Sequence, residues 1–237
     1  MPQIYYIRSQ LNEPVKNNRF ALLAASLFLM AALFSCHTQF KTIRNHTGFF
    51  VSTHDGAVKM YLPRDTFYEL KSHETVLSIG AESGANEVIY GLLTDSMHFD
   101  LENISAKYLE QASVDFSLEY YQKLFDKKST STTSIHIGND SSTLLPAASY
   151  QKVLIENSLH EFSAPKQMME ELYRIVKPGG AVYIFERMST PRHPIHQSCG
   201  KRLFSEAELT TLMQEAHFRI EKTALFEQVN LFKFSKQ

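Results

Sequence analysis

The sequence predicts an α/β domain built on a mostly parallel, doubly wound sheet that ends in an antiparallel hairpin. From Thr75 onward, short apolar strands alternate with helical patterns, which is typical of a parallel sheet covered by helices. The first strand runs into a loop bounded by Gly80 and Gly84 and then into a helix. Two strand-like runs, 218–226 and 229–234, lie close enough in the sequence to pair as the hairpin.

Five strands are expected before the hairpin, because each is a short apolar run next to polar or turn-forming residues. They cover residues 75–80, 97–101, 135–138, 152–155 and 181–186. A polar connector at 127–133 precedes the third of these strands.

Four helices are expected from apolar residues that recur at helical spacing. They cover residues 84–93, 105–126, 163–176 and 205–216. In the third helix, Ser163 is the expected N-cap, and Lys177-Pro178-Gly179-Gly180 is expected to end the helix. In the fourth, Ser205 and Glu208 have the spacing of a capping box.

The N-terminal segment carries an uncharged apolar run of sixteen residues, 20–35, preceded by three basic residues. The run is shorter than the ~20 residues that span a bilayer, which favours a signal peptide. It ends at Leu33-Phe34-Ser35-Cys36, which resembles a bacterial lipoprotein box in which the cysteine is lipidated. We expect residues 1–35 to be a signal or membrane-anchoring segment and Cys36 to be lipidated. A buried helix or a short signal anchor is the alternative, and the protein is cytoplasmic if the segment is not used.

Composition limits the partners of the chain. Lys+Arg number 24 and Asp+Glu number 25, so the net charge of -1 provides no basic excess for a nucleic-acid backbone. Loss of residues 1–35, which hold three basic residues and one acidic residue, would make the net charge -3. Two cysteines cannot form a multi-bridge framework, so burial must stabilise the fold. Residues 36–237 are expected to form a single domain with its core at 75–234, and the oligomeric state stays open.

The loop after the first strand is the first candidate ligand site. Gly80 and Gly84 would let a ligand approach backbone N–H groups at the N-terminus of the next helix, as in nucleotide-binding turns. Asp100 and Glu102 follow at the expected end of the second strand, where a carboxylate can accept both ribose hydroxyls of an adenosine-containing cofactor. The alternative is a tight structural turn with solvated acids.

Two later segments favour the cofactor interpretation. The fourth strand continues into Glu156-Asn157-Ser158-Leu159-His160-Glu161, and the next helix leads into Lys177-Pro178-Gly179-Gly180. This pair resembles the fourth strand and following helix of class I S-adenosylmethionine-dependent methyltransferases, whose fold is Rossmann-like. The resemblance covers roughly residues 75–234. His196-Gln197-Ser198-Cys199 also resembles a late loop in one bacterial branch of that family.

The resemblance implies S-adenosylmethionine as cofactor, a small-molecule methyl acceptor and a set of cofactor-binding positions. The methionine part would lie over Gly80, Ala81, Glu82 and Gly84, the ribose hydroxyls on Glu102 or Asp100, the adenine near Asn139 and Asp140, and the sulfonium side near Asn157.

Methyl transfer from a sulfonium is an in-line displacement, so the protein supplies mainly proximity and orientation. A base is needed only if the acceptor must lose a proton. His160 is the expected base and Glu161 could orient or replace it; the alternative for His160 is a loop residue that packs beside the cofactor.

A second cluster of polar residues has the spacing of metal ligands. His193, His196 and Cys199 recur at three-residue intervals, but no fourth ligand of matching spacing follows. We therefore expect no metal site and interpret residues 187–200 as a loop that covers the substrate.

The sequence departs from the family pattern at four positions: Ser78, Glu82, Asn103 and Gln151. Glu82 replaces the central loop glycine and places a side chain and a negative charge beside the cofactor. These departures motivate an alternative function, a catalytically inactive, methyltransferase-like, lipid-anchored binding or scaffold protein.

Overall fold

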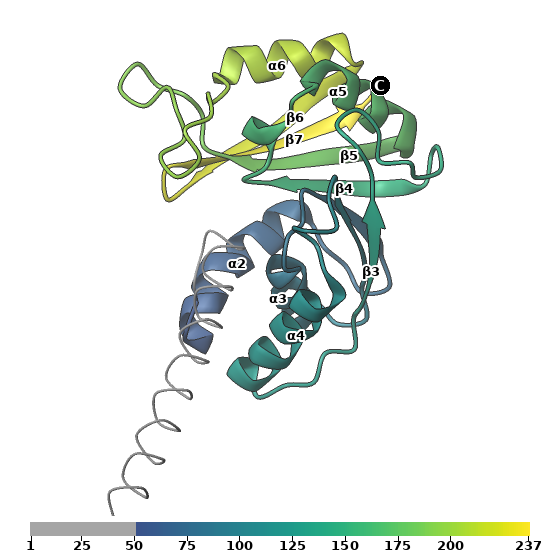
Figure 1. Cartoon of the computed structure of the whole chain (residues 1–237), viewed down its shortest axis with the longest axis vertical. Helices are drawn as coiled ribbons and strands as arrows, with labels where there is room; N and C mark the ends of the chain where they lie inside the picture. Colours follow the sequence, from purple (N-terminus) through teal and green to yellow (C-terminus); the bar gives the residue numbers. More distant parts are fainter. Residues whose placement is uncertain (1–50) are drawn as a thin grey trace, which may run out of the picture. The chain divides into compact units, whose positions relative to one another are not determined.

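The computed structural model describes residues 51–237, which all lie in one compact unit (Figure 1). The predictions for residues 1–35 and for Cys36 lie outside these residues. None of the helices within 51–237 is long and apolar enough to cross a membrane.

A seven-stranded sheet with the order β3-β2-β1-β4-β5-β7-β6 forms the centre of the domain. Its strands are β1 (Thr75–Ile79), β2 (His98–Asn103), β3 (Thr132–Ile137), β4 (Tyr150–Glu156), β5 (Val176–Glu186), β6 (Phe218–Phe226) and β7 (Val229–Lys236). The first five run parallel, and β7 pairs antiparallel with both β5 and β6. The predicted fold class and its C-terminal hairpin are confirmed. The strand order reverses between β1 and β4, the position at which ligands bind in this type of sheet.

Helices cover both faces of the sheet. On one side lie α2 (His54–Tyr68), α3 (Ala85–Leu93) and α4 (Gln111–Phe125), and on the other α5 (Pro165–Ile175) and α6 (Glu206–Glu215) (Figure 1). Successive residues of β4 point to opposite faces of the sheet. Leu154 packs in the core beneath α2, α3 and α4, and Val153 and Ile155 pack in the core beneath α5 and α6. Burial on both faces explains the continuous apolar runs of the central strands.

Several element boundaries differ from the predictions, and local contacts explain two of them. β3 starts at Thr132 instead of residue 135, since Thr132–Ser134 pair with His98–Asp100 on β2. The helix predicted from residue 105 begins at Gln111. The residues before it form a turn in which the Asn103 side chain accepts from the backbone N–H of Ser105.

The ends of α5 and α6 test the capping predictions. α5 begins at Pro165 with Ala164 as its N-cap, so the prediction of Ser163 as N-cap is wrong. The helix ends at Ile175, and the Lys-Pro-Gly-Gly segment lies in a bulge of β5, where pairing jumps from Tyr150↔Val176 to Lys152↔Ala181. The capping box of α6 is confirmed, with Ser205 accepting from the N–H of Glu208.

The hairpin carries an irregularity on its outer strand. The β6–β7 register shifts between Ile220 and Lys222, which leaves Glu221 in a bulge. The carboxylate of Glu221 accepts from Nζ of Lys233, at 2.9 Å, and from the hydroxyl of Ser235 on the paired strand.

Candidate functional site

A cavity of about 930 Å³ opens at the carboxyl ends of β1, β2 and β4, where the strand order reverses. Its wall is built from the loop after β1, the start of α3, the residues after β4, and the loop that follows β5. Nine of the predicted site residues line it: Gly80, Ala81, Glu82, Gly84, Glu102, Asp140, Asn157, His160 and Glu161. Asp100 and Asn139 do not line it.

The loop after β1 is held in place by glycine geometry and by the end of β2. Gly80 has φ 76°, and a Cβ on it would overlap the side chain of Ser158. The backbone N–H groups of Gly80 and Ala81 donate to the carbonyl of Glu102, at 2.9 and 3.0 Å. Gly84, with φ 64°, is the N-cap of α3. The first residues of that helix therefore face the cavity, as the glycine spacing predicts.

Glu82 brings a carboxyl group into this loop. Burial, reinforced by the negative charge of Glu161, raises the pKa of Glu82 to about 7. The carboxyl is therefore largely neutral below pH 7 and becomes charged above it.

Glu102 and Asp100, the two acids proposed for the ribose, have different surroundings. Glu102 is 1% exposed, and its buried Oε1 has no hydrogen-bond partner among residues 51–237. Burial raises the pKa of Glu102 to about 7, although the nearby N–H of Gly138 opposes the shift. An unpaired buried acceptor at the cavity wall is suited to a ligand hydroxyl.

Asp100, in contrast, is occupied by protein side chains. Its carboxylate accepts from Nε2 of His136 and from the hydroxyl of Tyr150, each at 2.8 Å. Burial alone would raise the pKa of Asp100, but these two hydrogen bonds and the nearby histidines lower it overall. Of the two acids, Glu102 is the one that keeps a carboxylate oxygen unpaired among the described residues.

The remaining predicted cofactor residues lie around the other strand ends. Asn139 closes its own turn, with Oδ1 accepting from the N–H groups of Ser141 and Ser142 at 3.0 Å each. Asp140 lines the cavity beside it. Asn157 follows β4 in a left-handed conformation, with φ 51°, and its N–H donates to the carbonyl of Phe185.

Sequence reasoning missed a carboxylate at the end of β4. Oε1 of Glu156 accepts from the hydroxyls of Tyr68 and Tyr90, both at 2.5 Å. Oε2 accepts from Nδ2 of Asn86 at 2.8 Å and from Nη1 of Arg64 at 3.3 Å. The position of Glu156 at the end of an apolar strand could have indicated a site residue. Its partners Arg64 and Tyr68 could not be predicted, because they come from α2, which has no clear apolar stripe.

An acid also lies next to Ser78, the first of the four departures from the family pattern. The Ser78 hydroxyl donates to Oε1 of Glu87 at 2.5 Å, and Glu87 lines the cavity from α3. Burial raises the pKa of Glu87 to about 7, and the Ser78 hydrogen bond only partly offsets this. Glu87 of α3 thus places a carboxyl group beside Ser78, although β1 carries no acidic residue of its own.

His160 is oriented by a residue that the sequence reasoning did not name. Its Nδ1 lies 3.1 Å from both carboxylate oxygens of Glu186, the last residue of β5. Its Nε2 is buried without a hydrogen-bond partner in the part of the chain that the structure describes, and Oε1 of Glu161 is 3.8 Å away. Glu186 therefore orients the ring, and the exposed Glu161 lies beside the opposite nitrogen.

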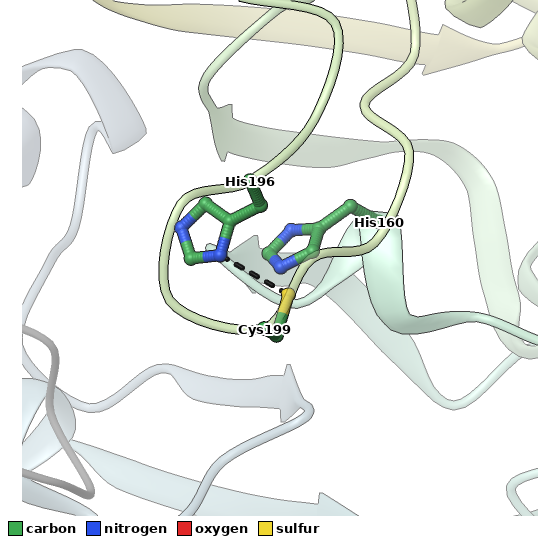
Figure 2. Close-up of side chains that lie close together, drawn as sticks. All are labelled: His160, His196 and Cys199. Carbon is green, nitrogen blue, oxygen red and sulfur yellow. Dashed lines mark hydrogen bonds between the residues drawn. The ribbon is translucent and has the colours of Figure 1, made fainter.

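The loop after β5 brings two more side chains to His160. Figure 2 shows the ring of His196 beside that of His160, with Cys199 pointing toward the space between them, and the two ring centroids are 4.3 Å apart. Nδ1 of His196 lies 3.2 Å from Sγ of Cys199. Burial and the neighbouring His160 lower the pKa of His196. His193, which the spacing had placed with this pair, is not part of this group among the described residues, and its backbone N–H and carbonyl bond to Thr190.

Comparison with known proteins gives one family that matches part of the chain. Residues 92–184 match the protein family described as a methyltransferase domain. No curated protein matches the chain. The matched stretch begins within α3, after the loop that carries Glu82, and ends within β5.

Solved structures share the fold at low sequence identity. An S-adenosylmethionine-dependent methyltransferase from Aquifex aeolicus is 18% identical, with 75% of this chain and 90% of that chain covered and a TM-score of 0.56. One from Methanosarcina mazei is 15% identical, with 73% and 97% covered and a TM-score of 0.57. The [4+2]-cyclase SpnF is 16% identical, with 73% and 62% covered and a TM-score of 0.54.

The domain therefore has the Rossmann-like fold of S-adenosylmethionine-dependent methyltransferases, and the family match supports a methyltransferase. A cyclase with the same fold shows that the fold alone does not determine the reaction. The reaction depends on the residues of the cavity.

Proposed function

We propose that the protein is an S-adenosylmethionine-dependent methyltransferase that acts on a small molecule. The observation that carries this proposal is the buried Oε1 of Glu102, a residue of β2 that lines the cavity, because this oxygen has no partner among the described residues. Ribose hydroxyls would satisfy this acceptor, and leaving it unpaired costs free energy.

The other residues of the cavity fit the same ligand. Gly80 and Gly84 adopt the left-handed conformations of the loop that lines the cavity, and Asp140, which is expected near the adenine, lines the same cavity. When bound, the cofactor supplies an electrophilic methyl group on a sulfonium. The chain binds and orients the two reactants and excludes water, because an in-line displacement needs little more. The assignment of His160 and Glu161 to proton removal stays a prediction and applies only to an acceptor that must lose a proton.

Calorimetry of the full chain with S-adenosylmethionine and S-adenosylhomocysteine tests the proposal. We expect saturable binding that Glu102→Ala weakens by about 10-fold or more, because a hydrogen bond to a charged group contributes roughly 1.5–3 kcal/mol. Asp100→Asn is the matched control on the same strand and should keep the affinity within about 3-fold, below the change expected from a lost hydrogen bond. Absence of heat at millimolar ligand would contradict the proposal.

The second candidate is an inactive, lipid-anchored scaffold with this fold, and the observation that favours it is Glu82. Its buried carboxyl group and the neighbouring Glu161 carry like charges at the cavity wall above pH 7. If the wild type binds no cofactor and Glu82→Gly does, the scaffold function is supported. Tight binding by the wild type supports the enzyme.

Membrane anchoring through Cys36 is proposed on the sequence alone. Radiolabelled palmitate should enter the wild type and not Cys36→Ser. Equal labelling of both proteins, or none, would contradict lipidation at this cysteine. Mass spectrometry of the N-terminus would then show whether residues 1–35 are removed.

A further inference from the structure

The cluster of His160, His196 and Cys199 has the composition and spacing of a metal site. One potential ligand atom from each residue lies within 4.8 Å of the others (Figure 2). Zn–N bonds of 2.0–2.1 Å and Zn–S bonds of about 2.3 Å give ligand atoms about 3.5 Å apart in a tetrahedral site. The 3.2 Å between Nδ1 of His196 and Sγ of Cys199 is close to that separation, and side-chain rotation could close the rest.

The buried His160 is the independent observation that indicates a ligand. Its side chain is 1% exposed, and Glu186 accepts at Nδ1 because a carboxylate has no proton to donate there. In the neutral ring Nε2 then carries the lone pair, and this buried atom has no hydrogen-bond partner within residues 51–237. A histidine whose other nitrogen donates to a carboxylate is the usual arrangement of a metal ligand.

The loop after β5 holds the other two residues in position. The N–H of Gly200 donates to the carbonyl of His196 at 2.8 Å, which closes a turn with Cys199 inside it. Nζ of Lys201 donates to the carbonyl of Glu161 at 3.2 Å and joins this turn to the segment that carries His160. The turn and the Lys201 hydrogen bond therefore help to hold the segments that carry the three ligand-type side chains close together.

We propose that His160, His196 and Cys199 bind a divalent transition metal, with zinc(II) as the ion that two imidazoles and one thiolate fit best. Hard cations such as magnesium prefer oxygen ligands, which this set does not offer. The site differs from the cluster suggested by sequence spacing, because His160 takes the place of His193. It also gives Nε2 of His160 a role other than that of a general base.

Three protein ligands would leave one coordination position, as in catalytic rather than structural zinc sites. His160 and His196 line the cavity, so this position would face it. A hydroxyl or thiol bound there would release its proton to solvent more readily. That consequence rests on the proposed function, whereas metal binding itself does not.

Zinc titration against a chromophoric chelator tests the site. The full chain with Cys36→Ser is used so that Cys199 is its sole cysteine. We expect one zinc per chain, with affinity reduced at least about 10-fold in Cys199→Ser and His196→Gln, and roughly 10- to 100-fold in Glu186→Gln through loss of ligand orientation. His193→Gln is the matched control and should bind zinc as the parent does. Zinc binding that is absent, or equal in Cys199→Ser and the parent, would overturn the proposal.

Cobalt(II) substitution provides a second test that does not depend on variants of a buried residue. The parent protein should show a thiolate-to-cobalt charge-transfer band that Cys199→Ser lacks, with unchanged far-ultraviolet circular dichroism in both. A cobalt complex of the parent without this band would exclude Cys199 as a ligand and overturn the proposed set. Calorimetry with S-adenosylmethionine is measured separately, so a failure of the methyltransferase proposal is distinguishable from a failure of the metal site.

Discussion

Gly138 leaves the space that the carboxylate of Glu102 occupies. The two residues lie at the ends of neighbouring strands, β3 and β2, and a Cβ on Gly138 would overlap Oε1 of Glu102. The same Cβ would also come within 2.7 Å of the carbonyl oxygen of Ser142, so no simple rotation would make room. The position of the proposed ribose acceptor thus depends on a glycine in another strand.

Gly138→Ala should therefore displace Glu102 and lower the affinity for S-adenosylmethionine. We expect a loss of about 10-fold in affinity and of about 1–3 kcal/mol in the free energy of unfolding, from overpacking. Calorimetry and urea unfolding measure the two effects. Gly91→Ala is the control, since its Cβ would meet Ser131 at 2.8 Å, away from the cavity. Equal affinity losses in both variants would contradict a specific effect on Glu102.

Glu102→Gln should stabilise the protein at alkaline pH. Because folding raises the pKa of Glu102 to about 7, its protonated form stabilises the fold fully below pH 4.5, and this contribution is lost as the pH rises through 7. The glutamine variant carries no charge, so it should gain up to about 3 kcal/mol over the wild type at pH 8 and little at pH 4.5. Urea unfolding at both pH values measures the gain.

Asp100→Asn should have the opposite effect at pH 8. The pKa of Asp100 is lowered on folding, so its charged form contributes stability above the ordinary pKa of 3.8 and loses it as the pH falls below that value. We expect the variant to be less stable than the wild type at pH 8. A gain in stability there would contradict the hydrogen bonds assigned to His136 and Tyr150.

Gly80→Ala should destabilise the loop after β1 through two separate causes. The left-handed backbone disfavours alanine by about 1 kcal/mol or more, and the new Cβ would overlap Ser158. Adding Ser158→Gly removes the overlap and leaves the backbone strain. A double-mutant cycle by urea unfolding should therefore give a favourable coupling of about 1 kcal/mol. Strict additivity would show that the two side chains do not meet.

The tyrosines around Glu156, which lines the cavity, provide a graded test of this polar cluster. Tyr68→Phe and Tyr90→Phe each remove a hydrogen bond to a buried carboxylate and should cost roughly 1.5–3 kcal/mol in the free energy of unfolding. Tyr61→Phe is the matched control, because its hydroxyl donates to the neutral Oδ1 of Asn86. Its cost should be nearer 1 kcal/mol. The same cost for all three would contradict a charged acceptor.

Periodicity predicted the sheet well because its central strands are buried on both faces. β1, β4 and β5 contain short continuous apolar runs, which are typical of strands buried on both faces of a parallel sheet. The hairpin was predictable because two strand-like runs are joined by a short connection. α2 could not be found in this way. Its buried residues include Arg64 and Asp65 and it contains Pro63, so its sequence shows no apolar face.

The sequence predicts which residues of the site lie at the ends of strands. It does not predict which of them contact one another across neighbouring strands. Both Asp100 and Glu102 end the second strand on the same face, and sequence alone cannot choose between them. The choice depends on β3 and β4, which bring His136 and Tyr150 to Asp100 and leave Glu102 free of such partners. Glu186 and His160 likewise meet only because β4 and β5 are neighbours.

The bulge at Glu221 has a consequence for the outer border of the sheet. β6 is an edge strand, and a regular edge presents unpaired backbone groups to which a strand of another molecule can add. Here the bulge breaks that row at its middle, between the charged residues Arg219 and Lys222. The bulge that places the carboxylate of Glu221 against Nζ of Lys233 therefore also disfavours edge-to-edge aggregation.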